Sequence, residues 1–297
     1  MPFWLIVVVL GIVEGITEFL PVSSTGHLLI AEHWLNLGQN SLFKALDQGD
    51  LFNIVIQSGA VLAVLPLFPE RLHQFFFRWR EPSTRTYLLK ILVPVLITGA
   101  IGYVLDKHDF KLPEKLMPVA IALFIGGVLF LLVEGWLKGR KMGDQITWLT
   151  AVAVGLAQLL AGVFPGTSRS GATILIALLL GVSRVAAVEY TFLVGIPTML
   201  GVSAWKIFKA LHHPPPNAVP EDWGMVALGF VVAAIVSFIA VKWLLRYVQS
   251  HTFVLFGWYR IALAIVIAGI LLAGAKKSER TGPGPGLPQP VQVAGNR

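Results

Sequence analysis

The chain has 297 residues, of which 56% are hydrophobic and 13% are charged, and it contains no cysteine. Counted with glycine and without tyrosine, the apolar share is about 64%, whereas soluble domains are on average about 45–50% apolar and about 25% charged. This composition excludes a soluble globular enzyme and favours a polytopic membrane protein. The absence of cysteine excludes disulfides and a thiol nucleophile, and the net charge of +7 is small enough to indicate membrane topology rather than nucleic-acid binding.

Eight apolar stretches follow one another along the chain. Two of them, 2–19 and 148–164, run into polar turns rich in Gly, Pro, Ser and Thr and then resume as short apolar pieces. Broken backbone at membrane depth is tolerated only where protein or a wet cavity shelters it. We therefore predict an all-α polytopic membrane protein with two re-entrant helix hairpins. Its six transmembrane helices are expected at 52–68, 87–105, 116–137, 186–208, 223–241 and 252–275.

The two broken stretches resemble each other. The first continues P-V-S-S-T-G-H-L-L-I-A from Pro21, and the second continues P-G-T-S-R-S-G-A-T-I-L-I-A from Pro165. Each is followed by three predicted spans, and an odd number of crossings places the two copies in opposite orientations. This pattern predicts an inverted repeat whose interrupted segments mark the site. The single membrane domain covers 1–275, with repeat one about 1–140 and repeat two about 141–275.

Loop charge predicts the orientation, because cytoplasmic loops carry an excess of Lys and Arg. The side opposite the N-terminus carries ten Lys and Arg residues in its loops. The side of the N-terminus carries six, or nine when the basic residues of the C-terminal tail are counted. We therefore expect the first hairpin to enter from outside and the second from the cytoplasm. The stretch 276–297 is expected to be a disordered tail. The N-terminal side carries six basic residues before the tail: Lys44, Lys107, Lys111, Lys115, Lys206 and Lys209.

Two carboxylates lie in the first half-helix. Glu14 and Glu18 are spaced i, i+4, so they share one helix face. Ionisable groups inside apolar segments are costly and usually functional. Besides plain interfacial carboxylates, two interpretations stay open: the pair can hold a hard divalent cation through oxygen ligands, or one member can act as a general base.

A hydroxyl-rich turn opens the second half-helix. Ser23, Ser24, Thr25 and Gly26 form it, and His27 follows at once. Free N–H groups at a helix start bind anions, and a histidine near a serine can serve as its base, as a nucleophile or as an acid to a leaving group. Taken singly, the hydroxyls are equally typical of helix capping, and a buried histidine can be structural.

The second turn supplies the remaining predicted phosphate-binding groups. Its guanidinium, that of Arg169, needs an anionic partner at membrane depth, and its planar fork fits phosphate oxygens. The structural alternative is an ion pair with Glu14 or Glu18 across the two copies. Together with Arg169, the groups expected at this turn are Ser168, Ser170, Gly171 and Thr173.

Four further polar residues have weaker interpretations. Gln57 and Gln158 either line a cavity or hydrogen-bond between helices. Glu189 is expected to be an interfacial carboxylate. Arg260, beside an aromatic pair, is expected to anchor the chain at the interface rather than bind a ligand.

Two carboxylates, hydroxyls, a histidine and an arginine around two half-helix starts are the parts that phosphoryl transfer requires. The chain has no G-x-x-x-x-G-K-[ST] motif, so nucleotide hydrolysis is not expected. A site inside the membrane predicts an amphiphilic substrate with a phosphate head and an apolar tail.

E-G-I-T-E-F-L-P-V-S-S-T-G-H at 14–27 and P-G-T-S-R-S-G-A-T at 165–173 closely resemble the two signature motifs of the bacterial undecaprenyl-diphosphate phosphatase (BacA/UppP, bacitracin-resistance) family. The resemblance covers essentially 3–275, including I-V-I-Q-S-G-A around Gln57. Two departures concern Asn53, where relatives often carry an acid, and Ser58, where they usually have leucine. Neither departure touches the signature motifs.

The resemblance implies hydrolysis of undecaprenyl diphosphate to undecaprenyl phosphate and inorganic phosphate, which recycles the lipid carrier for peptidoglycan and other envelope polymers. It implies a multi-pass protein of the bacterial cytoplasmic (inner) membrane, a site open to the periplasmic face, a Mg²⁺ or Ca²⁺ cofactor, a polyprenyl diphosphate substrate and, in many members, a homodimer. The family's acidic, metal-holding pair falls on Glu14 and Glu18, its proposed nucleophile on Ser24, its histidine on His27 and its phosphate-clamping arginine on Arg169.

A transporter is the competing function class, because inverted repeats with half-helices at the midplane are typical of secondary transporters. A lipid flippase of the same fold is a related alternative. The nucleophile-type residues beside a base and an arginine favour the hydrolase. The choice of nucleophile stays open between Ser24, His27 and an activated water.

Overall fold

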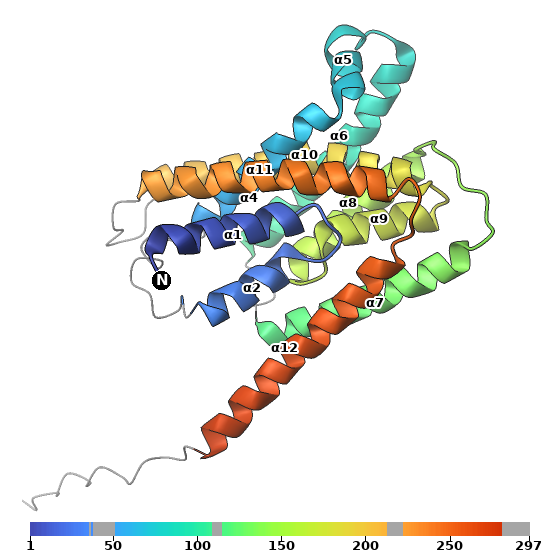
Figure 1. Cartoon of the computed structure of the whole chain (residues 1–297). Coiled ribbons are helices and arrows are strands. Elements are labelled where there is room, and N and C mark those ends of the chain that lie inside the picture. Colours follow the sequence, from blue (N-terminus) through green and yellow to red (C-terminus); the bar gives the residue numbers. More distant parts are fainter. Residues whose placement is uncertain (36, 38–50, 109–114, 213–221, 281–297) are drawn as a thin grey trace, which may run out of the picture.

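The computed structural model describes residues 1–35, 37, 51–108, 115–212 and 222–280 (Figure 1). The described residues form helices and contain no strand. The predictions for Lys44, Lys111 and the tail from 281, and those for the side chains of Lys209 and of 276–280, lie outside what is described. The elements are α1 (Phe3–Thr17), α2 (Ser24–Trp34), α4 (Leu51–Val64), η3 (Leu65–Leu67), α5 (Pro69–Phe77), α6 (Pro82–Lys107), α7 (Leu116–Leu137), α8 (Trp148–Val163), α9 (Arg169–Leu179), α10 (Arg184–His212), α11 (Trp223–Tyr247) and α12 (Val254–Arg280).

Among the described residues, five helices are long and apolar enough to cross a membrane: α6, α7, α10, α11 and α12. A sixth span results if α4 with η3 and the following α5 count as one, although they meet at an 82° bend. The bend lies at Pro69, which begins α5 and has no N–H to continue the preceding helix. The all-helical, multi-pass class predicted from the sequence is confirmed at this level.

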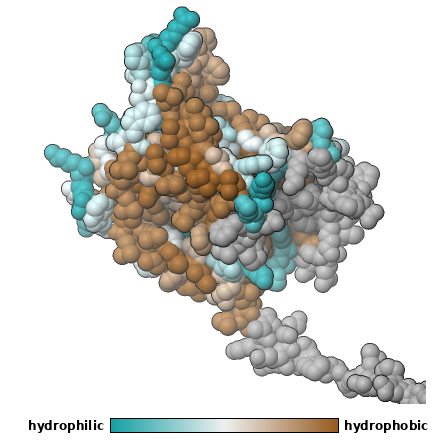
Figure 2. Space-filling model, turned by 180° about the vertical axis from the view of Figure 1, so that it is seen from behind, coloured by the Kyte–Doolittle hydropathy of each residue, from teal (hydrophilic) through white to brown (hydrophobic). Residues whose placement is uncertain are grey.

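The outer surface is apolar over its middle. Large hydrophobic side chains on α6, α7 and α11 are half or more exposed, among them Leu96, Leu132 and Ile239. Figure 2 shows a broad hydrophobic surface across the body of the molecule, with hydrophilic residues towards its edges. Exposed apolar area of this extent is expected of a protein whose solvent at that level is lipid.

The helical body contains two short helix pairs. The α1–α2 and α8–α9 pairs have first helices of 15 and 16 residues and second helices of 11 residues each. In the described structure α1 packs mainly on α11 and α8 on α6, while α7 packs on α12. Figure 1 shows the turns of the two pairs directed towards each other in the middle of the molecule.

Two ion pairs, both at least partly exposed, connect the surrounding helices. The carboxylate of Glu134 on α7 accepts hydrogen bonds from the guanidinium of Arg184 on α10 and from the backbone N–H of Phe253 at 2.9 Å. The carboxylate of Glu189, expected to be interfacial, accepts a 2.5 Å hydrogen bond from Arg71 on α5. Both carboxylates therefore have structural partners away from the hairpin turns.

Close packing of α1 on α11 depends on glycine. A Cβ atom added at Gly15 would lie 2.7 Å from the carbonyl oxygen of Ala233 and 2.8 Å from Cβ of Val236, nearer than such atoms approach. Small residues at helix contacts are typical of membrane proteins, because they let backbones approach closely.

We predict that Gly15→Ala lowers the thermal unfolding midpoint in detergent, because the added methyl overpacks the contact at a cost of about 1–3 kcal/mol. The matched control is Gly99→Ala on α6, where an added Cβ meets no atom within 4 Å. Fluorescence-monitored thermal unfolding compares the two. Equal midpoints for both variants would contradict the close-packing argument.

Candidate active site

Each hairpin turn ends on a serine with an unusual backbone. Ser23 precedes α2 with φ 73° and ψ 102°, and Ser168 precedes α9 with φ 67° and ψ 113°. They are the only described residues other than glycine with positive φ. This region costs an L-residue on the order of 1–3 kcal/mol, and such residues cluster at ligand sites. The two turns thus share one strained conformation directly before a helix start.

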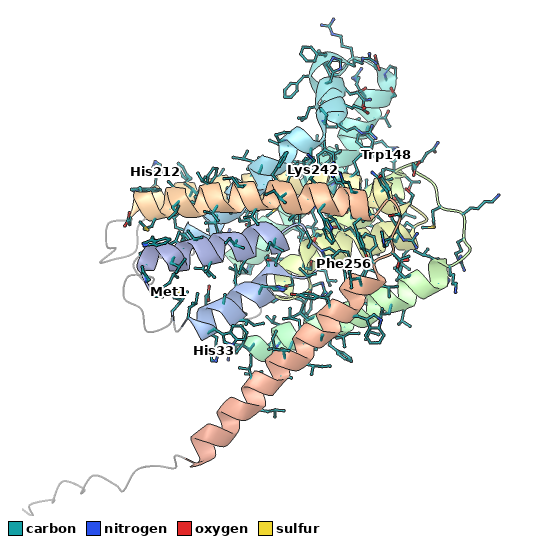
Figure 3. All side chains as sticks on the ribbon, viewed as in Figure 1. Met1, His33, Trp148, His212, Lys242 and Phe256 are labelled. Carbon is teal, nitrogen blue, oxygen red and sulfur yellow. The ribbon has the colours of Figure 1, made fainter. Side chains whose placement is uncertain are left out.

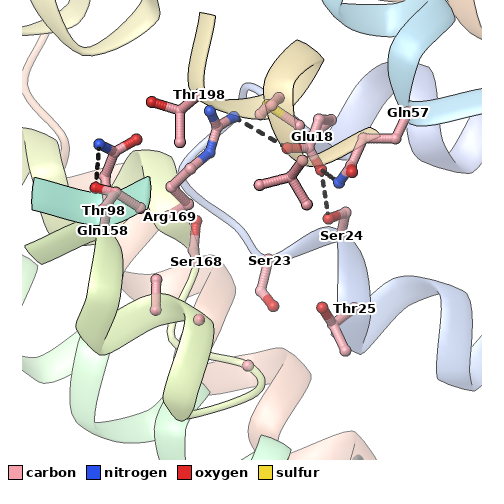
Figure 4. Close-up of a pocket in the computed structure, with 15 residues that line it drawn as sticks. Glu18, Ser23, Ser24, Thr25, Gln57, Thr98, Gln158, Ser168, Arg169 and Thr198 are labelled. Atoms are coloured by element: carbon pink, nitrogen blue, oxygen red, sulfur yellow. Dashed lines mark hydrogen bonds and ion pairs between the residues drawn. The ribbon is translucent and has the colours of Figure 1, made fainter. Parts of the chain in front are cut away.

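A cavity of about 270 Å³ lies where the two turns meet, between the hairpins and the inner faces of α4, α6 and α10. Figure 4 shows its polar groups converging from both hairpins. The lining residues are Glu18, Ser23, Ser24, Thr25, Gln57, Thr98, Gln158, Ala161, Gly162, Gly166, Ser168, Arg169, Thr198, Met199 and Val202.

The carboxylate of Glu18 accepts hydrogen bonds from three side chains of the cavity, and its own side chain is only 5% exposed. One carboxylate oxygen, Oε2, accepts hydrogen bonds from Ser24 Oγ at 2.8 Å and from Gln57 Nε2 at 3.3 Å. The other, Oε1, accepts from Arg169 Nη2 at 3.0 Å. The ion pair between the two copies that the sequence suggested is therefore formed with Glu18, and the same carboxylate also holds the candidate nucleophile.

Arg169 lies at the cavity wall with one arm unused. Its Nη2 bonds Glu18, whereas its Nη1 is buried and has no hydrogen-bond partner among the described residues. Gly195 on α10 makes room for that arm, because a Cβ there would lie 2.3 Å from Nη1. A buried guanidinium donor without a partner is costly, so this arm is suited to an anion that enters the cavity.

His27 points away from the cavity. Its Nδ1 lies 2.7 Å from the carbonyl oxygen of Ser23, and its Nε2 lies 2.6 Å from the hydroxyl of Tyr259, whose ring stacks on the imidazole at an interplanar angle of 3°. Because a carbonyl only accepts, these partners assign the proton of a neutral imidazole to Nδ1 and make Nε2 an acceptor from Tyr259. Neither ring nitrogen contacts Ser24, so the geometry places Glu18 rather than His27 beside the serine hydroxyl.

The remaining predicted phosphate-binding residues divide between cavity and packing. Ser23, Thr25 and Ser168 line the cavity. Ser168 Oγ also caps α9 by accepting from the N–H of Gly171 at 3.2 Å. The other two hydroxyls donate to backbone carbonyl oxygens instead of lining the cavity. The hydroxyl of Ser170 donates to Leu20 O at 3.1 Å, and that of Thr173 donates to Arg169 O at 2.8 Å. Gly26, Gly171 and Glu14 do not line the cavity, and the functional roles of all these residues stay predictions.

The family model of the bacitracin resistance protein BacA matches residues 7–266, which include the turns of both hairpins and every candidate site residue. The chain belongs to this family. The resemblance stated from the two signature motifs is thereby confirmed.

Curated relatives match over nearly their whole length. A Rhizobium etli protein named undecaprenyl-diphosphatase is 50% identical over 267 residues, covering 90% of this chain and 96% of its own. A Xylella fastidiosa protein of the same name is 47% identical over 259 residues, covering 87% and 95%. A third, from Xanthomonas axonopodis pv. citri, is 47% identical over 267 residues, covering 90% and 96%.

Four polar cavity residues of this family member have only a weak signal in the sequence, or none. Gln57 both lines the cavity and bonds Glu18, so the two interpretations left open for it hold together. Gln158 donates through Nε2 to Thr98 Oγ1 at 3.0 Å, while its Oε1 is buried without a partner. Thr98 and Thr198 lie in unbroken apolar helices, where a threonine is unremarkable, so no sequence signal distinguishes them.

The position of Arg260 differs from the one expected from the sequence. It was expected to anchor the chain at the membrane interface, but its side chain is completely buried. Its guanidinium donates to backbone carbonyls of both hairpin turns and of α7. The exposed residues of this α12 segment are its neighbours Trp258 and Tyr259, so sequence position alone placed the arginine on the wrong face.

The carboxylate pair offers ligands of the kind that Mg²⁺ or Ca²⁺ prefers. Glu14 is 2% exposed, interacts with Glu18 and has a buried Oε2 with no hydrogen-bond partner. Within the described residues no group of three or more His, Cys, Asp or Glu gathers. Two carboxylates fit a hard cation that completes its shell with water and phosphate oxygens, which is how Mg²⁺ is usually bound.

Proposed function

We propose that this protein hydrolyses undecaprenyl diphosphate to undecaprenyl phosphate and inorganic phosphate, and so recycles the lipid carrier for peptidoglycan and envelope synthesis. The observation that carries this is the arrangement of Ser24, Glu18 and Arg169 at one buried cavity: a hydroxyl bonded to a carboxylate, beside a guanidinium with an unused donor. The relatives that cover nearly the whole chain are named for this activity.

In the proposed mechanism, Arg169 and the backbone N–H groups at the starts of α2 and α9 bind the terminal phosphate. Ser24 Oγ attacks the terminal phosphorus while its proton passes to Glu18 Oε2, the acceptor 2.8 Å away. The bond from that phosphorus to the bridging oxygen breaks, and undecaprenyl phosphate leaves with the bond's electron pair. Water then attacks the phosphoserine, the proton held by Glu18 returns to Ser24 Oγ as the bond from that oxygen to phosphorus breaks, and inorganic phosphate leaves carrying the water oxygen and its protons.

The cation is part of the same proposal. Glu14 and Glu18 would hold Mg²⁺ or Ca²⁺, which when bound neutralises charge on the phosphate oxygens. Glu14 supports this assignment because its buried Oε2 has no protein partner. Glu18 would then serve both the cation and Ser24 through its two oxygens.

We also propose that the two short helix pairs are re-entrant hairpins of an inverted repeat. Three observations support it. Ser23 and Ser168 share one strained conformation at matching positions of the two motifs. The packing of α1 on α11 corresponds to that of α8 on α6 once the copies are exchanged. Figure 3 places Met1, ahead of α1, at one side of the molecule and Trp148, at the start of α8, at the other.

The orientation and assembly belong to the proposal as well. Membership of a bacterial family supports the bacterial cytoplasmic membrane, and the loop charges support entry of the first hairpin from the periplasmic side. Arg78, Arg80 and Arg85, between α5 and the start of α6, are exposed on the side assigned to the cytoplasm. A homodimer is proposed on the family's pattern alone.

The decisive experiment measures phosphate release by the purified protein in detergent from a C55 or C15 prenyl diphosphate. We expect release that requires Mg²⁺ or Ca²⁺ and stops on addition of chelator, because two adjacent carboxylates and a diphosphate need a counter-charge. Absence of release with either ion present would favour the transporter or flippase, since a cavity between half-helices also suits transport.

Ser24→Ala is expected to abolish formation of a phosphoenzyme, and Glu18→Gln to slow it by about 10²–10⁴-fold, because the amide cannot take the serine proton. Rapid-quench experiments with substrate labelled in its terminal phosphate measure the covalent intermediate. Ser58→Ala is the matched control for loss of a buried hydroxyl, because the Ser58 hydroxyl donates to the carbonyl oxygen of Ile54 and does not line the cavity. A stable phosphoenzyme in Ser24→Ala would instead assign the nucleophile to His27, and turnover without any phosphoenzyme would assign it to water.

Arg169→Lys is expected to lower kcat/KM by about 10–100-fold, since one ammonium cannot bond Glu18 and a phosphate with the planar fork of a guanidinium. Steady-state phosphate release measures it. Arg140→Lys is the control, because Arg140 is exposed and stacks on Trp136 away from the cavity. Near-normal turnover in Arg169→Lys would contradict the clamp.

A further inference from the structure

We propose that Arg260 is a positioning residue that holds the turns of the two hairpins in register, so that Ser24 and Arg169 face the same cavity. This deepens the proposed function and rests on it for its kinetic consequence. The structural part stands on the contacts of Arg260 itself.

The guanidinium of Arg260 joins the two turns directly. Nη1 donates to the carbonyl oxygen of Pro21 in the first turn at 3.2 Å. Nη2 donates to the carbonyl oxygens of Thr167 at 2.9 Å and Gly166 at 3.3 Å in the second turn. The first turns of α12 therefore reach both hairpins, as their place beside the two turns in Figure 1 indicates.

The same side chain is tied to α7. Nε donates to the carbonyl oxygen of Leu123 at 3.4 Å and Nη2 to that of Ala122 at 3.3 Å. All three nitrogens of the guanidinium are thus engaged by backbone carbonyls. The planar fork of arginine, with its five N–H donors, can serve three chain segments at once, which a lysine ammonium on a flexible stem cannot do.

Stability alone does not explain a charge at this place. Arg260 is fully buried, and no carboxylate pairs with it in the described parts of the chain. Burying an ion without an opposite charge carries a desolvation penalty of several kcal/mol, and well-packed apolar replacements of buried ions are often neutral or stabilising. An ionisable residue inside a membrane segment is by default a functional residue. The role left for this one is to satisfy and fix the carbonyls of the turns.

The surrounding sequence is shaped to accept the guanidinium. A Cβ atom added at Gly126 on α7 would lie 2.2 Å from Nη2 of Arg260. One added at Gly171 on α9 would lie 3.1 Å from Nη1. A single methyl at Gly126 therefore displaces the fork while leaving the arginine chemically intact, which provides an independent way to disturb the contact.

The carbonyls held by Arg260 stand next to the reacting groups. Thr167 directly precedes Ser168, and Pro21 lies two residues before Ser23, so both bonded carbonyls fix the approach to the two strained serines. Each strained serine is followed at once by a site residue, Ser24 or Arg169. The fork of Arg260 therefore sets how far the nucleophile on one hairpin lies from the phosphate clamp on the other.

Tyr259, the preceding residue, adds a second contact to the first hairpin through its hydroxyl on His27. One turn of α12 thereby supports the first hairpin at its turn and along α2. His27 therefore helps to hold the first hairpin against α12 through Tyr259, although it does not line the cavity.

The kinetic test compares Arg260→Lys and Gly126→Ala with the matched control Gly135→Ala, on the same helix, where an added Cβ meets nothing within 4 Å. We expect kcat for C15 prenyl diphosphate to fall about 10²-fold in the first two variants, as for displacements near 1 Å in other enzymes. KM should change much less, because the binding groups themselves remain. The control should retain kcat.

The structural readout is a distance between the hairpins. Since the chain has no cysteine, spin labels can be attached at Ile16→Cys on α1 and Leu160→Cys on α8, both exposed positions. We expect a narrow distance distribution in the parent and the control, and a shifted or broadened one in Arg260→Lys and Gly126→Ala. This readout does not require turnover, so failure of the proposed function does not remove the test.

Unchanged distances in both variants overturn the proposal, and so does near-normal kcat despite changed distances. A fall in the thermal midpoint alone, with distances and kcat retained, assigns Arg260 to packing and also overturns it. If Arg260→Lys does not fold, Gly126→Ala decides, because it keeps the arginine. Parent protein that releases no phosphate refutes the proposed activity and leaves the distance result to judge the positioning role.

Discussion

The carboxylate of Glu18 is the interaction on which the rest of the site depends. It belongs to the first hairpin, yet it is bonded by Arg169 of the second and by Gln57 of α4. At membrane depth neither ion is tolerated alone, because removing one partner leaves an uncompensated buried charge. Contact between the hairpins therefore also neutralises their charges, and the cavity lies at that contact.

That meeting point requires irregular backbone inside an apolar body. The turns contain carbonyls that no helix can satisfy, and lipid offers no donor in place of water. Arg260 supplies the missing donors from α12. Glycines at the contacts of α1, α7 and α10 let the polar groups and helices approach, as Gly15, Gly126 and Gly195 show. The long apolar helices thus serve mainly to shelter two short polar turns.

The sequence alone predicted the helical class, the broken stretches and part of the cavity lining, because composition and local motif decide these features. Glu18, Ser24 and Arg169 were identifiable since polar residues are rare in apolar segments. The proton acceptor of Ser24 was not decided, because His27 and Glu18 are both near it in sequence and only the helix geometry turns His27 towards Tyr259. Arg260 was misplaced because its carbonyl partners lie 93 to 239 residues away.

Charge balance gives the physical reason for proposing a cation here. Glu18 pairs with the guanidinium of Arg169, and Glu14 interacts with both of these charges from outside the cavity lining. The charge of Arg260 is already engaged by backbone carbonyls. A diphosphate brings several more negative charges into a site where water screens them poorly. It also competes with Glu18 for Arg169, whose buried Nη1 has no hydrogen-bond partner among the described residues. A divalent ion on the carboxylates would free the guanidinium for the substrate, which makes cation, carboxylates and arginine one electrostatic unit rather than three separate contributors.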